Sequence, residues 1–353
     1  MAGLVRMHIM EDIELWNISR GRICRAGAQE IFNIVGRVRT FKYGDRLFYR
    51  LNGGEEREAF VFSGQGDCRR LMNEGDFNID TIHERELKRD NHLCFRLEKT
   101  DRRQKRSEIR FRVCLNEGSR PEFRLIPGQI DDAHEAGQVV DGKWRVGRDE
   151  TGASFLEIRP EDSGYDRIIL FGSRKWKSAY SVYARFRITA WTGLRDHGIG
   201  FAFRWSPHAC GRGKNLPSRW TSGIGMYYFP RNLPRPGLSV TYGVDVHYDE
   251  KSRYVGEHVL AQGFFSPWRW FLGSIQSNLL RFRYPLSQLV PGEAYCMRMI
   301  AAPDAHTLTV WKEGKREPPP QVRARRPHEW LKRGCAGIIA HHCALKVYEF
   351  EVE

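Results

Sequence analysis

The chain has 353 residues, of which 41% are hydrophobic and 12% aromatic, a composition typical of a globular protein and not of a disordered one. Its 57 Lys and Arg residues outnumber its 43 Asp and Glu residues, and the resulting formal net charge of +14 biases the surface toward anionic partners. The absence of an apolar run near the roughly 18 residues of a membrane span excludes a transmembrane helix.

The first part of the chain, residues 1–125, predicts a small β-sandwich. Asn52-Gly53 predicts a tight hairpin turn, because both residue types tolerate positive φ. The basic stretch Asp101–Arg106 predicts a hairpin loop between two alternating strands. Short strands bounded by turn residues are expected at 30–39, 46–51, 58–62, 75–80, 92–99 and 107–115.

Three segments of this part resemble the immunoglobulin-like modules of bacterial extracellular proteins. They are Phe32–Gly36, the hairpin Tyr49–Gly54 and the strand Gly75–Ile79. The resemblance implies an immunoglobulin-like sandwich of about seven strands.

The remainder, residues 126–353, predicts a second and larger all-β domain. Helical periodicity is almost absent from the whole chain, with single turns expected only at 67–73, 82–89 and 327–333. Alternating strands are expected at 142–146, 155–159, 167–171, 180–190, 199–205, 223–229, 238–248, 257–262, 294–301, 306–312, 335–343 and 347–352. About a dozen strands in this length favour a jelly roll of two large sheets.

Three segments of this second part resemble the concanavalin A-like lectin and glucanase superfamily. They are the opening Val140–Trp144, the middle strand Tyr180–Ile188 and the ending Gly337–Phe350. The resemblance implies a concanavalin A-like jelly roll whose ligand lies on the concave face of one sheet.

The segment Leu238–Asp249 carries a row of polar side chains on one face of its predicted strand. Valines and tyrosines alternate with Ser239, Thr241, Asp245 and His247. A row of hydroxyl, carboxylate and imidazole groups fits the floor of a groove that hydrogen-bonds a polar ligand. An ordinary outward face near a sheet edge is the alternative.

The same alternation selects further candidates for the groove. Arg204 shares a face with small residues, opposite Trp205, and Tyr227 lies opposite Tyr228. The turn that contains Asp166 and Arg167 presents an aromatic, an acid and a base together, and a structural salt-bridged turn is its alternative. The expected ligand-binding residues are Arg204, His208, Thr241, Asp245, Asp166 and Arg167, with Tyr227 and His247 as candidate catalytic residues.

The sequence supports carbohydrate or other polar-ligand binding first and leaves catalysis open. An enzyme on the same groove would be a lyase or hydrolase of an acidic glycan, or would convert a small metabolite, with Tyr227 or His247 moving a proton. A third alternative is a module whose basic loops contact anionic surfaces. Nucleic acid is not expected, because no zinc-finger, helix-turn-helix or RNA-binding signature accompanies the charge.

Metal, cofactor and compartment predictions follow from the remaining residues. No cofactor is expected, although the resemblance leaves room for a structural Ca²⁺ near Asp131-Asp132, and His341-His342 should point to opposite faces of a strand. Eight scattered cysteines indicate a reducing compartment, with Cys94, Cys114 and Cys296 expected as buried apolar residues. Acidic residues near the start predict a cytoplasmic protein, or an extracellular one whose leader has been removed.

Overall fold

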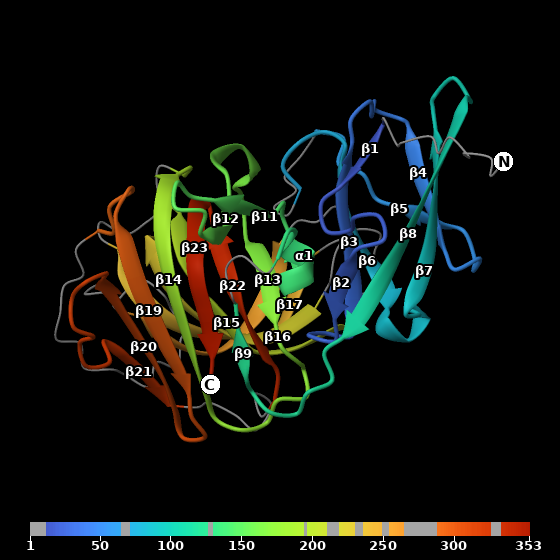
Figure 1. The fold of residues 1–353 in the computed structure, drawn as a ribbon. Coiled ribbons are helices and arrows are strands. Elements are labelled where there is room, and N and C mark those ends of the chain that lie inside the picture. Colours follow the sequence, from blue (N-terminus) through green and yellow to red (C-terminus); the bar gives the residue numbers. More distant parts are fainter. Residues whose placement is uncertain are drawn as a thin grey trace.

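The computed structural model confirms an all-β fold built from four sheets. It describes residues 12–64, 71–125, 130–193, 196–209, 219–229, 236–248, 254–264, 288–325 and 333–353. Two sheets lie in an N-terminal unit, residues 12–115, and two in a C-terminal unit, residues 123–353 (Figure 1). Among the described residues, no helix is long and apolar enough to cross a membrane.

The N-terminal unit packs a three-stranded sheet against a five-stranded one around a shared apolar core. The first sheet has the order β1 (Ile13–Leu15), β3 (Ile31–Val38) and β6 (Asp76–His83). The second has the order β2 (Ile23–Ala26), β8 (Gln104–Leu115), β7 (Asp90–Glu98), β4 (Arg46–Leu51) and β5 (Arg57–Ala59). Strand β2 runs parallel to β8, and η1 (Glu84–Glu86) is a short 3₁₀ turn.

The hairpin between β4 and β5 forms as the sequence predicted. Asn52 and Gly53 adopt φ values of 52° and 74°, the left-handed conformations that such a turn requires. The expected helical turn at 82–89 is reduced to η1, because β6 continues to His83. Whether this unit is immunoglobulin-like stays a prediction.

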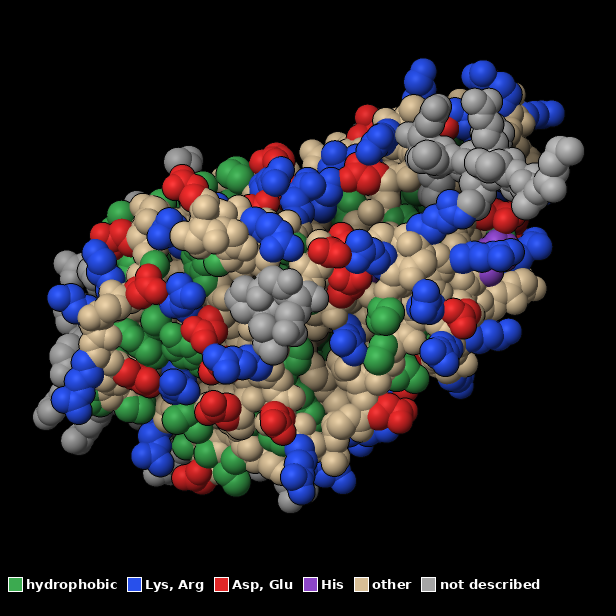
Figure 2. Space-filling view, in the orientation of Figure 1, with side chains coloured by type: hydrophobic (Ala, Val, Ile, Leu, Met, Phe, Trp, Pro, Cys, Tyr) green, Lys and Arg blue, Asp and Glu red, His purple; other side chains and the backbone are tan. Residues whose placement is uncertain are grey.

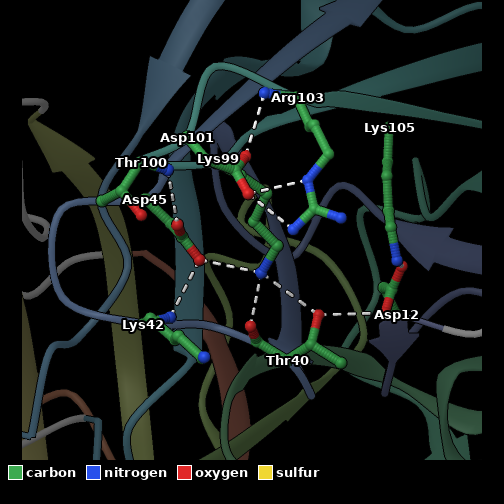
Figure 3. A network of polar contacts seen from close by, with 9 residues as sticks. All are labelled: Asp12, Thr40, Lys42, Asp45, Lys99, Thr100, Asp101, Arg103 and Lys105. Atoms are coloured by element: carbon green, nitrogen blue, oxygen red, sulfur yellow. Dashed lines mark hydrogen bonds and ion pairs between the residues drawn. The ribbon is translucent and has the colours of Figure 1, made fainter.

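The basic loop after β7 is held by ion pairs with its own neighbours (Figure 3). Lys99 Nζ lies 2.8 Å from Asp45 Oδ2, whose side chain is buried, and also donates to Thr40. Arg103 pairs with Asp101, and Lys105 with Asp12. The Lys99 contacts fasten the loop to the β3–β4 connection, and the Lys105 pair fastens the start of β8 to the residue before β1. In Figure 2 the Lys and Arg side chains are likewise interspersed with acidic ones.

The C-terminal unit is a sandwich of two antiparallel sheets. The seven-stranded sheet has the order β10 (Gln138–Asp141), β13 (Arg167–Phe171), β22 (Cys335–His341), β15 (His197–Ala209), β16 (Arg219–Phe229), β17 (Gly237–Tyr248) and β18 (Tyr254–Phe264). The eight-stranded sheet has the order β11 (Arg145–Arg148), β12 (Ser154–Ile158), β23 (Cys343–Val352), β14 (Tyr180–Trp191), β19 (Ala294–Ala301), β20 (Ala305–Lys312) and β21 (Val322–Arg325), with β9 (Phe123–Arg124) also paired to β23. The helices α1 (Ala133–Ala136) and η2 (Pro160–Asp162) are single turns.

The inner faces of the two large sheets meet in one apolar core. Phe201 packs against Phe350 across the sandwich, with ring centroids 6.1 Å apart, and Phe203 packs against His306 at 4.8 Å. Ile199 lies two residues before Phe201 on β15 and shares this inner face, as does Tyr227 of β16, which pairs in register with Ile199. The opposite side of the seven-stranded sheet is called its outer face below.

The two units are joined by buried amide hydrogen bonds. Asn78 of β6 donates to the carbonyl of Val140 and to Asp141 Oδ1, both at 2.8 Å. Gln138 accepts from the Ala28 N–H and donates to the Ile31 carbonyl. These side chains are almost fully buried, so each bond satisfies a polar group that water does not reach.

Candidate functional site

A group of polar and aromatic side chains gathers at one end of the outer face of the seven-stranded sheet. His341 ends β22, Tyr228 is near the end of β16, and Asp166 and Asp196 precede β13 and β15. His341 and Tyr228 both pair in register with Gly198 of β15, which lies between them. We call Tyr165, Asp166, Asp196, Tyr228, His341 and His342 the Asp–His cluster.

His341 lies between the two carboxylates of this cluster. Its Nδ1 lies 2.8 Å from Asp166 Oδ1, and its Nε2 lies 3.5 Å from Asp196 Oδ1. The Tyr228 hydroxyl donates to Asp196 Oδ1. The rings of Tyr165 and Tyr228 stand edge-on to the imidazole, with centroids 4.7 and 5.7 Å from it.

The carboxylates determine the charge of this histidine. Burial disfavours the imidazolium, but Asp166 and Asp196 outweigh it and raise the pKa of His341 to about 9. The nearby His341 imidazolium and the Tyr228 hydroxyl in turn hold the pKa of Asp196 well below its usual range. The neighbouring His342 behaves oppositely, because burial and the His341 cation both lower its pKa. At neutral pH the cluster therefore holds two carboxylates, one imidazolium and one neutral imidazole.

The cluster depends on unusual backbone geometry. Asp166, Asp196 and His342 have φ values of 39°, 71° and 44°, a region that residues other than glycine rarely enter. Three such residues within one side-chain group indicate a site whose shape is held by the surrounding structure. Gly198 contributes by having no side chain, since a Cβ there would meet Tyr228 Cδ2 at 3.2 Å and the Tyr227 carbonyl at 2.5 Å.

The prediction that His341 and His342 point to opposite faces is wrong. Strand β22 ends at His341, and the left-handed conformation of His342 breaks the alternation. The His342 N–H donates to the Gly164 carbonyl, and the two imidazole centroids lie 4.8 Å apart. The expected strand 335–343 is thus two strands, β22 and β23, joined at this residue.

Arg204 does not face a groove. The pairing of β15 shifts register between Phe203 and Trp205, and Arg204 takes a φ of 51°. Its side chain turns into the sandwich, where the guanidinium lies 4.6 Å from the Tyr180 ring centroid and Nη2 donates to the Ala301 carbonyl at 3.1 Å. Arg204 is 3% exposed and is therefore an interior residue. Its side chain turns inward because of a β-bulge, which alternation in the sequence does not reveal.

Tyr227 also lies inside the sandwich. Alternation correctly separated it from Tyr228, but the two faces were assigned the wrong way round. Tyr227 is 0% exposed, its hydroxyl accepts from the Leu289 N–H at 3.2 Å, and burial raises its pKa to about 12. Its solvent-side neighbour Tyr228 is the residue that reaches the Asp–His cluster.

The predicted pair Asp166 and Arg167 separates into two roles. Asp166 belongs to the Asp–His cluster, where its side chain is 26% exposed. Arg167 is buried, and its guanidinium donates to the carbonyls of Asp162 and Tyr165. Burial lowers the pKa of Arg167. Arg167 therefore holds the turn that presents Tyr165 and Asp166.

The side chains of the other predicted site residues lie outside the described part of the structure. His208 lies on β15, and Thr241, Asp245 and His247 lie on β17. Most of the aromatic stretch 264–271 is outside the described residues as well. Sequence reasoning missed Asp196, Tyr228, His341 and His342, and only the Gly-led turn at 164 pointed to this end of the sheet.

The acidic pair expected to hold Ca²⁺ is engaged by other groups. Asp131 lies 2.8 Å from Arg22 Nη1, and Asp132 accepts from the Ser19 hydroxyl and caps α1. Asp196, His341 and His342 lie close enough to share a metal ion. In this structure His341 is engaged by Asp166 and Asp196.

No protein-family model and no curated protein matches the chain. Solved structures with a similar strand arrangement include the exoplasmic domain of VIP36 in a Ca²⁺-bound form, with 12% identity and a TM-score of 0.40 over 65% of this chain and 88% of that one. A legume lectin-like domain from Entamoeba histolytica shows 10% identity and a TM-score of 0.35 over 60% and 88%. A carbohydrate esterase of the Shiga toxin-encoding bacteriophage phi24B shows 10% and 0.33 over 65% and 96%.

Proposed function

We propose that the Asp–His cluster binds a neutral carbohydrate or a similar polyhydroxyl ligand. The observation that carries the proposal is the pair of fixed, partly exposed carboxylates, with the Asp166 side chain 26% and the Asp196 side chain 37% exposed. Asp166 Oδ1 is held by His341 Nδ1, and Asp196 Oδ1 accepts from the Tyr228 hydroxyl and lies 3.5 Å from His341 Nε2. A carboxylate can accept several hydrogen bonds, so both keep acceptor capacity for a ligand. Carboxylates bond strongly to hydroxyl donors, and their orientation here is set before the ligand arrives.

Aromatic side chains border these acceptors. Tyr165 and Tyr228 are half-buried and flank His341 from two different strand ends. A sugar presents apolar C–H faces as well as hydroxyl edges, so a site with both tyrosine rings and fixed carboxylates matches both parts of its surface.

The local charge selects among carbohydrates. The partly exposed carboxyl groups of Asp166 and Asp196 oppose the approach of the carboxylate of a uronic acid or sialic acid. The molecule as a whole carries +14, but the described basic loop after β7 is paired with acidic neighbours. The cluster therefore favours neutral sugars, although the net charge of the chain favours acidic ones.

A glycan array that contains both neutral and acidic oligosaccharides tests this proposal. We expect binding to neutral glycans that persists at high salt, because hydroxyl–carboxylate bonds are not screened like long-range charge. Binding only to acidic glycans, lost at moderate salt and unchanged in Asp196→Asn, would instead assign recognition to the basic loops.

An enzyme on the same cluster is a second candidate, favoured by one observation. His341 and His342 are adjacent, yet their environments raise the pKa of the first and lower that of the second. A neutral imidazole beside an imidazolium is a base beside an acid, as general acid–base catalysis requires. Product analysis after incubation with the best-bound glycan tests this. Turnover by wild type would show catalysis. Loss of turnover in His342→Ala, with binding kept, would assign the base to His342.

A further inference from the structure

Three side chains with different metal-binding atoms meet on the N-terminal unit. Residues of β7 alternate strictly between the core and the surface, which places His92 and Cys94 on the same outward face. Glu108 of β8 is directly opposite Cys94 in the strand pairing. An imidazole, a thiol and a carboxylate therefore converge on one spot of this sheet, far along the chain from the Asp–His cluster.

The distances between the three groups match those around a tetrahedral zinc ion. His92 Nε2 lies 3.0 Å from Glu108 Oε2 and 3.6 Å from Cys94 Sγ. With Zn–S near 2.3 Å and Zn–N and Zn–O near 2.0–2.1 Å, tetrahedral angles place nitrogen about 3.3 Å from oxygen and about 3.5 Å from sulfur. All three ligand atoms lie within 4.8 Å of one another. Small side-chain adjustments would bring them around one ion.

The chemistry of the three groups also selects the ion. A thiolate, an imidazole and a carboxylate suit Zn²⁺ and exclude the hard ions Mg²⁺ and Ca²⁺, which prefer oxygen. Deprotonated Cys94 and Glu108 together neutralise a divalent charge. This matters because Arg50 faces Cys94 from β4, and a neutral complex avoids repulsion from it. Glu108 is exposed, so water can reach the fourth position.

The partial exposure of Cys94 was not expected from sequence. Alternation within an apolar strand predicted a buried thiol, but Cys94 and Cys114 are half-exposed and only Cys296 of the three is buried. Leu93 and Phe95 fill the core on either side of Cys94, which turns its thiol outward. Accessibility is what a ligand thiol needs and a packing thiol does not.

We propose that His92, Cys94 and Glu108 form a binding site for Zn²⁺ or a similar transition-metal ion, with water as the fourth ligand. The site does not depend on the proposed carbohydrate function. It would fasten β7 to β8 on the surface of the five-stranded sheet.

Cobalt substitution tests the site directly. Reduced full-length protein is titrated with Co²⁺ and followed by the thiolate-to-cobalt charge-transfer band and the visible bands of tetrahedral cobalt, and Zn²⁺ is then added in competition. Wild type should show both bands, and Zn²⁺ should abolish them. Cys94→Ser should lose the charge-transfer band. It should also bind Zn²⁺ roughly 100-fold more weakly, since loss of a residue that merely orients a ligand already costs about 10–100-fold.

Cys114→Ser is the matched control. Cys114 is also half-exposed and lies on β8, but its sulfur accepts from Arg25 Nη1 at 3.2 Å, and among the described residues it belongs to no group of possible metal ligands. We expect this variant to keep both bands, and Glu108→Gln to weaken them in a protein whose melting temperature without metal is unchanged. The proposal is overturned if wild type gives no charge-transfer band, or if Cys94→Ser retains the band while Cys114→Ser loses it.

Discussion

His341 makes the stability of the protein depend on pH in a defined direction. The folded-state pKa of about 9 lies above the ordinary histidine value of 6.5. Between these values the folded protein keeps a proton that the unfolded chain releases. The contribution is therefore complete below pH 6.5 and is lost as the pH rises through about 9. At about 1.4 kcal/mol per pKa unit, it is on the order of 3 kcal/mol.

Urea unfolding of wild type and His341→Gln at pH 6 and pH 9.5 measures this contribution. The difference in unfolding free energy between the two proteins should be large at pH 6 and should shrink at pH 9.5. Burial also raises the pKa of the thiols of Cys24, Cys335 and Cys343, which lowers stability at high pH. Both proteins contain these thiols, so their contribution cancels in the difference between the two unfolding free energies. A difference that is constant across this range would show that folding does not shift the pKa of His341.

A substitution at Tyr227 should affect stability and not ligand binding, because its hydroxyl is bonded inside the sandwich. Tyr227→Phe removes the bond to the Leu289 N–H and leaves a buried donor without that partner. We expect a loss of about 1–2 kcal/mol in unfolding free energy, measured by urea titration, with ligand binding unchanged. Weaker glycan binding at unchanged stability would instead indicate that Tyr227 contacts the ligand.

The two clearest errors of the sequence analysis share one cause at this scale. Arg204 and His342 both have positive φ although neither is glycine. Face assignment assumes that every residue continues the alternation, and one left-handed residue ends it. Asp166 was identified because a glycine precedes its turn, whereas nothing in the sequence marks Arg204 or His342 in that way.

At the scale of elements, Gly198 couples strand pairing to the site. A methyl group there would meet the Tyr227 carbonyl at 2.5 Å and press on the Tyr228 ring. Gly198→Ala should cost about 1–3 kcal/mol of stability by thermal or urea unfolding and should weaken ligand binding by displacing Tyr228. Gly118→Ala, where a Cβ meets nothing within 4 Å, is the control and should change neither. If Gly198→Ala is destabilised but binds the ligand as wild type does, Gly198 is not needed to position Tyr228 for binding.

Strands of five to eight residues between clear turn signals were the most predictable elements. The expected ranges 46–51, 167–171 and 294–301 coincide with β4, β13 and β19, because alternation and flanking turn residues are local signals. The short strands β1, β2, β9, β10 and β21 and the single turn α1 were missed. Each has at most four residues, too few to show a period, and its pairing depends on distant partners.

At the scale of the whole molecule, buried amides make the two units interdependent. Asn78→Ala removes the donors to Val140 and Asp141 together with the acceptor for Asn33 Nδ2. We expect a loss of about 2–3 kcal/mol, because buried partners remain unsatisfied. The exposed Asn73→Ala is the control. Calorimetry should show one cooperative transition for wild type, and two well-separated transitions would contradict this interdependence.

We propose that the ligand binds on the outer face of the seven-stranded sheet, at the Asp–His cluster. Isothermal titration of the best glycan from the array, with wild type, Asp196→Ala, Asp166→Ala and Tyr227→Phe, tests it most directly. Removing either carboxylate should weaken binding by roughly 10–100-fold, the value of a charge-assisted hydrogen bond of about 1.5–3 kcal/mol, and Tyr227→Phe should bind like wild type. Affinities unchanged in both aspartate variants would place the ligand elsewhere on the protein.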